Sequence, residues 1–399
     1  MDRSQVDQLD RREVVILAGA RTPLGKLNGA LSSLTAVELG AAALRAAIER
    51  SGVDAGDIDA VIVGQVLQAG AGQGPARQSS IAAGIGWDVP ATTINKLCLS
   101  GLTAVIDGAR LIRTGEAEVV AVGGQESMSN APHLLMGTRK GWPYGSVPAL
   151  DHMAHDGLTD AFDRDSMGLS TERHNAPLDI SREDQDAVAA ASHQRAAAAA
   201  DILAEEIVPV TVKSRKGETV VQADEGIRPE STAESLAKLR PAFDAEGTIT
   251  AGNSSQISDG AAAMILASRE YAEAHGLGWL AVVGAAGQVA GPDNSLQAQP
   301  AHAVEAALRR AGWAVGDLDF VEINEAFAAV ALHSTRQLGL DAKDVNIHGG
   351  AIALGHPIGA SGARLALHAA YELSRRGKGK AAVSLCGGGG QGEALLLSR

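Results

Sequence analysis

The sequence has few cysteines, few aromatic residues and no long apolar stretch, and each of these features limits the class of protein that it can encode. Two cysteines in 399 residues are too few for the disulfide framework of a small secreted protein, so we expect reduced thiols. Aromatic residues make up only 3%, and a core must therefore be built from Ala, Val, Leu and Ile. No stretch reaches the roughly 18 uninterrupted apolar residues that a transmembrane helix needs. We expect a soluble chain with no membrane span.

Positive charge is also scarce. Lys and Arg number 34 against 47 Asp and Glu, which gives a formal net charge of −13. Such a chain is unsuited to general binding of nucleic acid or an anionic membrane, although it is compatible with a local basic patch for an anionic cofactor. Residues 1–13, MDRSQVDQLDRRE, show neither the apolar stretch of a signal peptide nor the Arg-rich, acid-poor character of a transit peptide. We expect a cytoplasmic location.

Short apolar stretches alternate with helical ones along the chain. Residues 13–18 and 58–66 are apolar, with several β-branched side chains, which favours buried strands. Between them, residues 35–51 place apolar side chains at helical spacing and end at Gly52, a helix stop. This alternation predicts a parallel α/β sheet that is covered by helices.

An internal repeat organises the chain. Residues 46–63 (AAIERSGVDAGDIDAVIV) align without a gap on residues 306–323 (AALRRAGWAVGDLDFVEI), with identities in the helix, at its glycine stop and in the Asp-x-Asp turn before the strand. The match continues, because Ser100-Gly101 and a helix correspond to Ser361-Gly362 and a helix. Two copies of one βα unit fused in one chain explain the order of these matches, and chance similarity in an Ala-rich sequence is the alternative.

Residues 129–257, between the two copies, have a different composition, with more Asp, His and Pro. We interpret them as an insertion that covers a site and supplies contacts to a ligand. The insertion contains a strong helix at residues 182–200 and the cluster His152, His155 and Asp156. This cluster suggests a metal site, but its spacing supports metal ligation poorly, so a solvated loop is the preferred interpretation and no metal is predicted.

Two cysteines lie in settings suited to chemistry. Cys98, in TINKLCLSG, comes between a strand and a helix start, where the helix dipole would lower the pKa of its thiol; a structural cysteine is the alternative. Cys386 ends a strand in SLCGGGGQG, where the glycines leave its sulfur and the following N–H groups accessible to a reacting carbonyl; a plain glycine turn is the alternative. Neither this glycine cluster nor the one at residues 346–362 has the order of strand, GxGxxG and helix that a dinucleotide-binding motif requires.

A histidine and an asparagine complete the set. His356 is a titratable ring in the glycine-rich stretch NIHGGAIALGHPIGASG, just before a helix at residues 363–373, and a satisfied structural histidine is the alternative. Asn324, in VEINEAFA, ends an apolar strand. By the repeat, this places Asn324 at the carboxyl end of a strand, where α/β sheets hold their sites.

With these four groups in view, the chain resembles the thiolases, and among them the short-chain acetyl-CoA acetyltransferases. The resemblance covers about residues 13–399 and rests on motifs in their proper order: ARTPLGKLNG, INKLCLSG, GGQESMS, AKLRPAF, TAGNSSQISDGAAA, EINEAFA, GGAIALGHPIGASGAR and CGGGGQG. It implies a thiolase-like α/β fold, with duplicated βα halves packed as a five-layer α-β-α-β-α sandwich. The halves would be residues 1–128 with 258–278 and residues 279–399, and residues 129–257 would be an inserted loop domain for CoA binding and oligomer contacts.

The resemblance implies a role for each group. Cys98 resembles the nucleophile that becomes acylated, and His356 the base that activates it and helps to form an oxyanion site. Cys386 corresponds to the acid/base that removes the α-proton of the second acetyl-CoA. Asn324 assists the oxyanion site of His356 through a water, and the main-chain N–H groups of Cys98 and Gly388 match a second site. The implied reaction is the reversible Claisen condensation of two acetyl-CoA to acetoacetyl-CoA and CoA, a ping-pong acyl transfer through an acyl-cysteine.

The resemblance also implies the ligand and the assembly. Coenzyme A and acetyl-CoA would be substrates, with no permanently bound cofactor, in a homotetramer built as a dimer of dimers. Arg228 would meet the phosphate-bearing end of CoA. The positions that match residues in contact with CoA, its pantetheine arm or the acyl end are Arg228, Ser255, Leu158, Met167, Ala326 and Phe327.

Two positions depart from the family pattern. Ser166 stands where many short-chain members have His, and His348 stands where Asn is common. Ser166 bears on acyl-chain preference, so a degradative 3-ketoacyl-CoA thiolase of broader or longer chain length is an alternative function. Decarboxylating ketoacyl synthases lack a second cysteine, and Cys386 argues against them. A non-catalytic acyl-CoA or lipid-binding relative is an alternative of another class.

Overall fold

The computed structural model describes residues 12–215 and 217–399, so the start of the expected N-terminal half lies outside the described residues. A 10-stranded sheet runs through the molecule in the order β12-β13-β14-β11-β1-β10-β5-β3-β4, with β2 paired to β10. The N-terminal part of this sheet comprises β1 (Val14–Arg21), β2 (Gly25–Lys26), β3 (Ala60–Gly64), β4 (Ala91–Ile94), β5 (Val119–Ser127) and β10 (Ser258–Ser268). The C-terminal part comprises β11 (Ala281–Ala290), β12 (Phe320–Ile323), β13 (Lys380–Gly387) and β14 (Gln391–Ser398).

The sheet is mixed, so the expectation of a parallel sheet is wrong in part. β3 runs parallel to β4 and β5, and β12 runs parallel to β13, as helical crossovers require. β13 and β14 are antiparallel because a tight hairpin joins them, in which Gly389 and Gly390 have φ of 74° and 66°. β1 pairs antiparallel with both β10 and β11 and thereby joins the two parts of the sheet.

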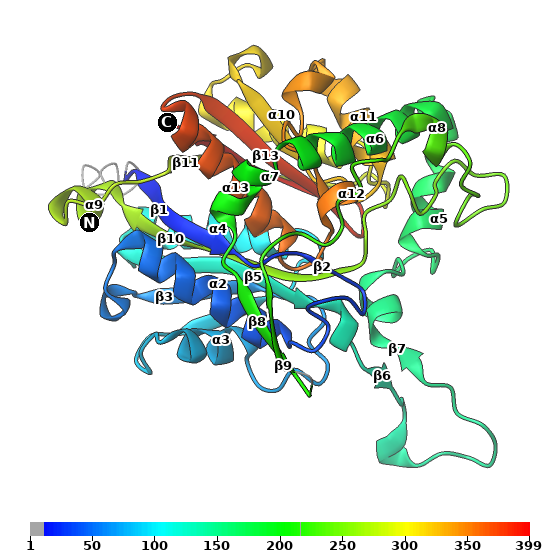
Figure 1. Ribbon diagram of the computed structural model, residues 1–399, viewed down its shortest axis with the longest axis horizontal. Coiled ribbons are helices and arrows are strands. Elements are labelled where there is room, and N and C mark those ends of the chain that lie inside the picture. The colour runs from blue at the N-terminus through cyan, green and yellow to red at the C-terminus, as the bar shows by residue number, and fades with distance from the viewer. Residues whose placement is uncertain (1–11, 216) are drawn as a thin grey trace.

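Helices form three layers around the two parts of the sheet, and the predicted α-β-α-β-α sandwich is confirmed (Figure 1). α2 (Ala36–Ser51) and α3 (Pro75–Ala83) cover the outer face of the N-terminal part. α10 (Gln299–Ala311) and α11 (Ala328–Leu338) cover the outer face of the C-terminal part. α4 (Ser100–Thr114) and α13 (Ser361–Arg376) pack on each other between the two parts.

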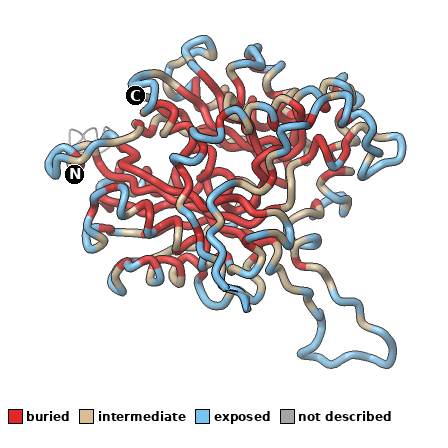
Figure 2. The backbone as a smooth tube through the Cα atoms, viewed as in Figure 1, coloured by how far each residue is buried: buried red, intermediate tan, exposed pale blue. Residues whose placement is uncertain are grey.

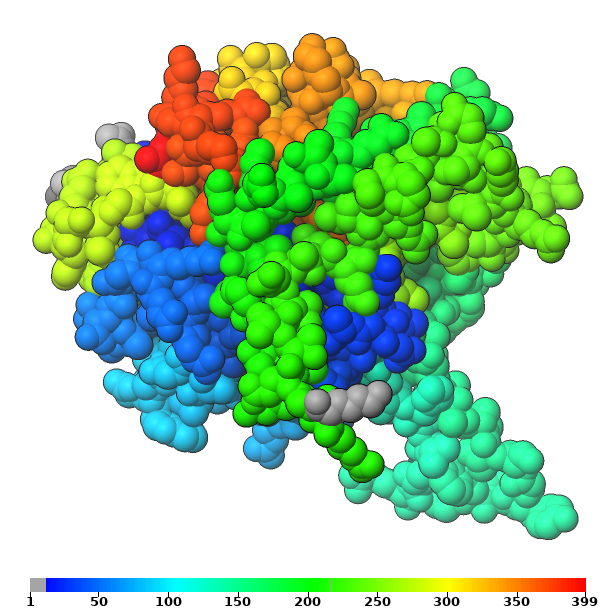
Figure 3. All heavy atoms as spheres, in the orientation of Figure 1, coloured from blue at the N-terminus to red at the C-terminus, as the bar shows by residue number. Residues whose placement is uncertain are grey.

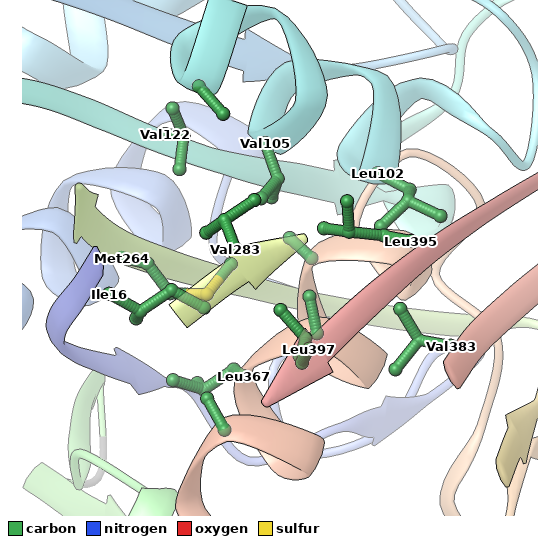
Figure 4. Close-up of a cluster of buried hydrophobic side chains, with 14 of the residues drawn as sticks. Ile16, Leu102, Val105, Val122, Met264, Val283, Leu367, Val383, Leu395 and Leu397 are labelled. Carbon is green, nitrogen blue, oxygen red and sulfur yellow. The ribbon is translucent and has the colours of Figure 1, made fainter. Parts of the chain in front are cut away.

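The middle of the sandwich is an aliphatic core (Figure 4). It joins Leu102 of α4 and Leu367 of α13 to Val122 and Val383, which come from the two parts of the sheet. Burial of each such side chain stabilises the fold by about 1.5–3 kcal/mol. Figure 2 shows that this buried region is continuous through the body of the molecule.

The two repeated segments fold alike. α2 and α10 each end at a glycine with left-handed φ, 72° and 68°, and a short 3₁₀ turn and then β3 or β12 follow. The second Asp of each turn makes the same bond: Asp59 Oδ2 accepts the N–H of Val119 at 3.0 Å, and Asp319 Oδ2 accepts that of Lys380 at 2.8 Å. Each carboxylate ties its turn to the first residue of the neighbouring parallel strand, which explains why the motif occurs twice.

The two Ser-Gly pairs meet at the centre of the molecule. A methyl group on Gly101 would lie 2.8 Å from the backbone nitrogen of Ala363, and one on Gly362 would lie 2.4 Å from that of Leu102. Only glycine permits this contact between the first turns of α4 and α13. The contact brings together the loops that precede the two helices, and these loops carry the predicted nucleophile and the predicted base.

The insertion between β5 and β10 surrounds one end of the sheet. Between β6 and β7 it extends away from the body as a tongue, residues 135–149 (Figures 1 and 3), in which Leu135, Met136, Trp142 and Tyr144 are exposed. The domain boundaries given above stay predictions. The elements of the insertion are β6 (His133–Leu134), β7 (Leu150–Asp151), a π-helical turn (Met153–Gly157), α5 (Met167–Arg173), α6 (Arg182–Ala198), α7 (Ala200–Glu206), β8 (Val210–Ser214), β9 (Gly217–Val221) and α8 (Ala233–Leu236).

Two short helices complete the described fold: α9 (Arg269–Ala274) follows β10, and α12 (Ala351–Leu354) precedes the loop of His356. Among residues 12–215 and 217–399, no helix has the length and apolar character to cross a membrane.

Candidate active site

One cavity of about 470 Å³ brings together three of the four chemical groups. Cys98, His356 and Cys386 line its wall together with Gly388. A volume of this order is typical of small-molecule sites. Much of the remaining wall is apolar and includes Met128, Leu158, Met167, Phe243, Leu296, Phe327 and Ile358.

Cys98 lies in a strained turn immediately before α4. Leu97, which precedes it, has a φ of 53°, a left-handed conformation that a bulky side chain rarely adopts. The N–H groups of Cys98 itself and of Gly388 donate toward the sulfur. If an acyl group were attached to this sulfur, an oxyanion formed on it would need two backbone donors that converge in this way.

The pKa of the Cys98 thiol is raised to about 12. Burial is the main cause; the two N–H groups oppose it, and the charge of Glu126 raises the pKa further. The expectation that the start of the helix lowers this pKa is therefore wrong, because loss of hydration outweighs the helix dipole. Cys98 is a neutral thiol at pH 7 and needs a base to become a nucleophile.

The His356 side chain is held as a neutral imidazole. Its Nδ1 lies 2.5 Å from Ser361 Oγ, and the Ser361 hydroxyl donates to the carbonyl of Pro357 at 3.0 Å. The hydroxyl hydrogen is thus used, so Nδ1 carries the imidazole proton and Nε2 presents its lone pair. Burial, together with the charge of Arg364, lowers the pKa of His356 to about 3.

Cys386 lies one residue before the end of β13, is 1% exposed and lines the same cavity as Cys98. Burial raises the pKa of its thiol, and the charge of Cys98 raises it further. In the turn that follows, a methyl group on Gly388 would lie 2.8 Å from Leu97 Cδ1, so the Leu97 side chain would have to shift. The N–H of Gly388 donates toward the sulfur of Cys98, so this turn brings the two cysteine loops together.

Asn324 follows β12, as the repeat predicted, and lies beside Nε2 of His356, although it is not among the residues that line the cavity. Its Nδ2 is 3.5 Å from His356 Nε2, and the side chain is fully buried. Within the described part of the chain, its Oδ1 has no hydrogen-bond partner. The four sequence-predicted groups are therefore gathered in one place, although β12 and β4 lie at opposite edges of the sheet.

Most positions predicted to contact CoA lie on the same cavity. Ser255, Leu158, Met167, Ala326 and Phe327 all line it. Arg228 is the exception: it is exposed at the surface, where its backbone N–H donates to His193 Nδ1 at 3.2 Å. Its proposed contact with the phosphate-bearing end of CoA stays a prediction.

The His152 cluster is in part the expected solvated loop, because His155 and Asp156 are exposed, but His152 is buried. His152 is 5% exposed, and its Nδ1 lies 2.5 Å from Asp156 Oδ2, which closes the π-helical turn. Its Nε2 accepts the N–H of Ala69 at 3.3 Å. The turn contributes Ala154 to the cavity wall. Across residues 12–215 and 217–399, no group of three or more His, Cys, Asp or Glu is arranged to hold a metal ion.

The two departures from the family pattern differ in their relation to the cavity. Ser166 lines it and caps α5 by accepting the N–H of Leu169 at 3.3 Å. His348 lies outside it, with Nδ1 3.1 Å from His368 Nε2.

Sequence reasoning missed two side chains that hold the site: Ser361 and Glu126. Both lie in motifs quoted above, GHPIGASG and GGQESMS, but their partners could not be read from the motif. Glu126 Oε2, for example, accepts the N–H of Gly359, which is 233 positions away in the sequence.

Comparison with family models decides the class of protein. The model described as "Thiolase, N-terminal domain" matches residues 14–270, and the model described as "Thiolase, C-terminal domain" matches residues 277–399. The chain belongs to the thiolase family.

Relatives of this thiolase align along nearly the whole chain. It is 57% identical to the probable acetyl-CoA acetyltransferase of Mycolicibacterium smegmatis, over 96% of this chain and 100% of the relative. It is 48% identical to the acetyl-CoA acetyltransferases of Chromobacterium violaceum and Pseudomonas aeruginosa, in each case over 97% of this chain and 100% of the relative. This thiolase is therefore an enzyme of the acyltransferase class, and the resemblance drawn from its motifs is confirmed.

Proposed function

We propose that this thiolase is an acetyl-CoA C-acetyltransferase, which joins two acetyl-CoA to give acetoacetyl-CoA and CoA, reversibly. The observation that supports this is the convergence of two thiols and one neutral imidazole on a single, largely apolar cavity. The names of the relatives at 46–57% identity point to the same reaction.

In the first half-reaction, Cys98 Sγ attacks the thioester carbon of acetyl-CoA as its proton passes to His356 Nε2. The proton transfer has to accompany the attack, because both groups are neutral before substrate reacts. The bond from carbon to the CoA sulfur then breaks, and Cys386 gives its proton to the leaving thiolate. The products are an acetyl-Cys98 thioester, an imidazolium at His356, a thiolate at Cys386 and free CoA.

In the second half-reaction, the Cys386 thiolate removes an α-proton from a second acetyl-CoA. A thiolate with a raised pKa is a stronger base, which suits so weakly acidic a C–H group. The Nε2–H of His356, with Asn324 beside it, would donate to the enolate oxygen.

The new carbon–carbon bond forms when the enolate carbon attacks acetyl-Cys98. The N–H groups of Cys98 and Gly388 would hold the resulting oxyanion. Collapse of this intermediate expels the Cys98 thiolate, which recovers its proton from His356. All three groups return to their starting protonation states.

We also propose a homotetramer, a dimer of dimers, and a cytoplasmic location. Two features of the surface support association: β4 is an edge strand with a free side, and the tongue exposes Trp142 and Tyr144 far from the body. Light scattering on the purified protein should give four times the mass of the chain, and a monomer at micromolar concentration would contradict the assembly.

A degradative thiolase for longer 3-ketoacyl chains is the second candidate. Ser166 favours it, because this side chain lines the cavity and is smaller than the His that many short-chain members have there.

CoA-dependent cleavage of acetoacetyl-CoA, run beside a 3-ketoacyl-CoA of ten or more carbons, separates the candidates. Turnover of the short substrate alone would support the acetyltransferase. Preference for the long substrate would support the degradative enzyme, and stoichiometric binding of both without turnover would support an acyl-CoA carrier.

A further inference from the structure

Glu126 is a buried carboxylate next to the candidate active site that the mechanism above does not use. It lies near the carboxyl end of β5, and its side chain is fully buried. No Lys, Arg or His among the described residues forms an ion pair with it. Burial of an unpaired carboxylate is costly, so its position calls for a compensating interaction.

That interaction comes from the backbone of two loops. Glu126 Oε2 accepts the N–H groups of Val66 at 3.0 Å and Gly359 at 2.9 Å, and Oε1 accepts that of Leu67 at 3.1 Å. Three such bonds are an arrangement that stabilises a buried carboxylate. The close fit at one of them excludes any side chain, because a methyl group on Gly359 would lie 2.8 Å from Oε2.

Both loops adjoin residues that line the cavity. Gly359 lies between His356 and Ser361, whose hydroxyl fixes the imidazole tautomer. Val66 and Leu67 belong to the buried cluster against which Cys98 packs. A single carboxylate therefore holds the loop of the base against the loop that backs the nucleophile.

The charge of Glu126 also acts on the nucleophile. It is one of the causes that raise the pKa of Cys98. The pKa of Glu126 itself is raised to about 7, first by burial and also by Asp259 of β10, against the three N–H groups that lower it. Asp259 and Cys98 are the titratable neighbours that bear on it.

We propose that Glu126 is a positioning residue that also has an electrostatic role. Its carboxylate fastens the His356 loop, and its negative charge adds to burial in opposing ionisation of Cys98. The loss of activity expected below rests on the proposed function. The effect on the thiol does not, since alkylation of Cys98 can be measured without any turnover.

Replacement of Glu126 by Gln tests both roles at once. Gln keeps the shape but sets an N–H₂ group against at least one backbone N–H, so the loop loosens and the charge disappears. We expect kcat for acetoacetyl-CoA cleavage to fall at least about tenfold, while alkylation of Cys98 by iodoacetamide at pH 8 becomes about three- to tenfold faster, as a pKa fall of up to one unit implies. Peptide mapping assigns the adduct to Cys98.

Two control variants separate charge from loosening. Gln65→Met removes a neutral tether of the same loop, the bond from Gln65 Nε2 to Leu67 O of 2.9 Å, and should not accelerate alkylation. Glu116→Gln removes an exposed charge just before β5 and should change neither rate. A folded E126Q enzyme with unchanged or slower alkylation would overturn the electrostatic role, and one with wild-type kcat would overturn the positioning role.

The wild-type enzyme gives a test that needs no variant. Between about pH 6 and 8, ionisation of Glu126 should progressively raise the pKa of Cys98, so the alkylation rate should rise less than tenfold per pH unit there and return to about tenfold above pH 8. A uniform tenfold rise per unit across the whole range would overturn the electrostatic role, even if E126Q failed to fold.

Discussion

Ser361 fixes the orientation of His356 by accepting a hydrogen bond from its Nδ1 at 2.5 Å, while its own hydroxyl donates to Pro357 O at 3.0 Å. The bond leaves Nε2 as the only nitrogen able to take a proton from Cys98. In the proposed mechanism, a residue at the first turn of α13 thus sets which nitrogen of His356 takes the proton.

Replacement of Ser361 by Ala should lower kcat/KM about 10- to 100-fold, because the imidazole loses its fixed tautomer. Ser361→Thr keeps the hydroxyl and should restore most of the activity. The ¹⁵N shifts of His356 should show a mixture of tautomers in the Ala variant and one tautomer in the Thr variant. An Ala variant with wild-type kcat/KM and an unchanged tautomer would contradict this role.

Gly388→Ala should impair both half-reactions, since a methyl group there would lie 2.8 Å from Leu97 Cδ1, and either Leu97 beside Cys98 or the N–H that points at Cys98 has to shift. Loss of one oxyanion donor typically costs about 10²–10³ in kcat. Gly316→Ala is a matched control, because a methyl group on this exposed glycine meets nothing within 4 Å. Steady-state cleavage of acetoacetyl-CoA measures both, and equal activity of the two variants would remove Gly388 from the site.

Glu206 should contribute stability that depends on pH. Its carboxylate contacts His368 Nδ1 and lies 2.9 Å from Arg21 Nε, with no exposure to solvent. Burial alone would raise its pKa, but the charges of His368 and Arg21 overcome this and lower the pKa to about 2. A lowered pKa in the folded state means that the stabilisation is complete above about pH 4.5 and is lost as the pH falls toward 2.

Glu206→Gln should therefore lower the free energy of unfolding by about 3 kcal/mol at pH 7, because it takes the carboxylate partner from buried His368 and leaves Arg21 with Asp224 as its remaining partner. Its neighbour Glu205 is exposed, so Glu205→Gln should cost at most about 1 kcal/mol. Urea unfolding of both variants at pH 7 tests the difference. Equal costs at the two positions would show that the buried network does not stabilise the fold.

Much of the architecture could be predicted from sequence because the repeat carries it. The helix stops and the Asp59 and Asp319 turns fix two equivalent βα units, and the Ser-Gly pairs mark the two central helices. The antiparallel strands could not be predicted in the same way. β10, with the sequence SDGAAAMILAS, consists largely of small residues with no strand preference, and its place between β1 and β5 is decided by packing alone.

The site could be predicted to the level of residue types but not of their energetics. Cys98, His356 and Cys386 do line one cavity, yet the pKa of Cys98 moves in the direction opposite to that expected from the helix start. Burial decides that direction, and burial depends on chain segments distant in sequence. For the same reason neither Glu126 nor Ser361 could be assigned before their partners were seen.

The division of labour between the two thiols is the central claim, and acetylation of two variants tests it most directly. Cys386→Ala, mixed with acetyl-CoA and freed of released CoA, should carry one acetyl group on Cys98 by intact mass and peptide mapping, and should form no acetoacetyl-CoA. Cys98→Ala should carry none. An acetyl group on Cys386 in the Cys98→Ala variant, or condensation at the wild-type rate by Cys386→Ala, would contradict the account.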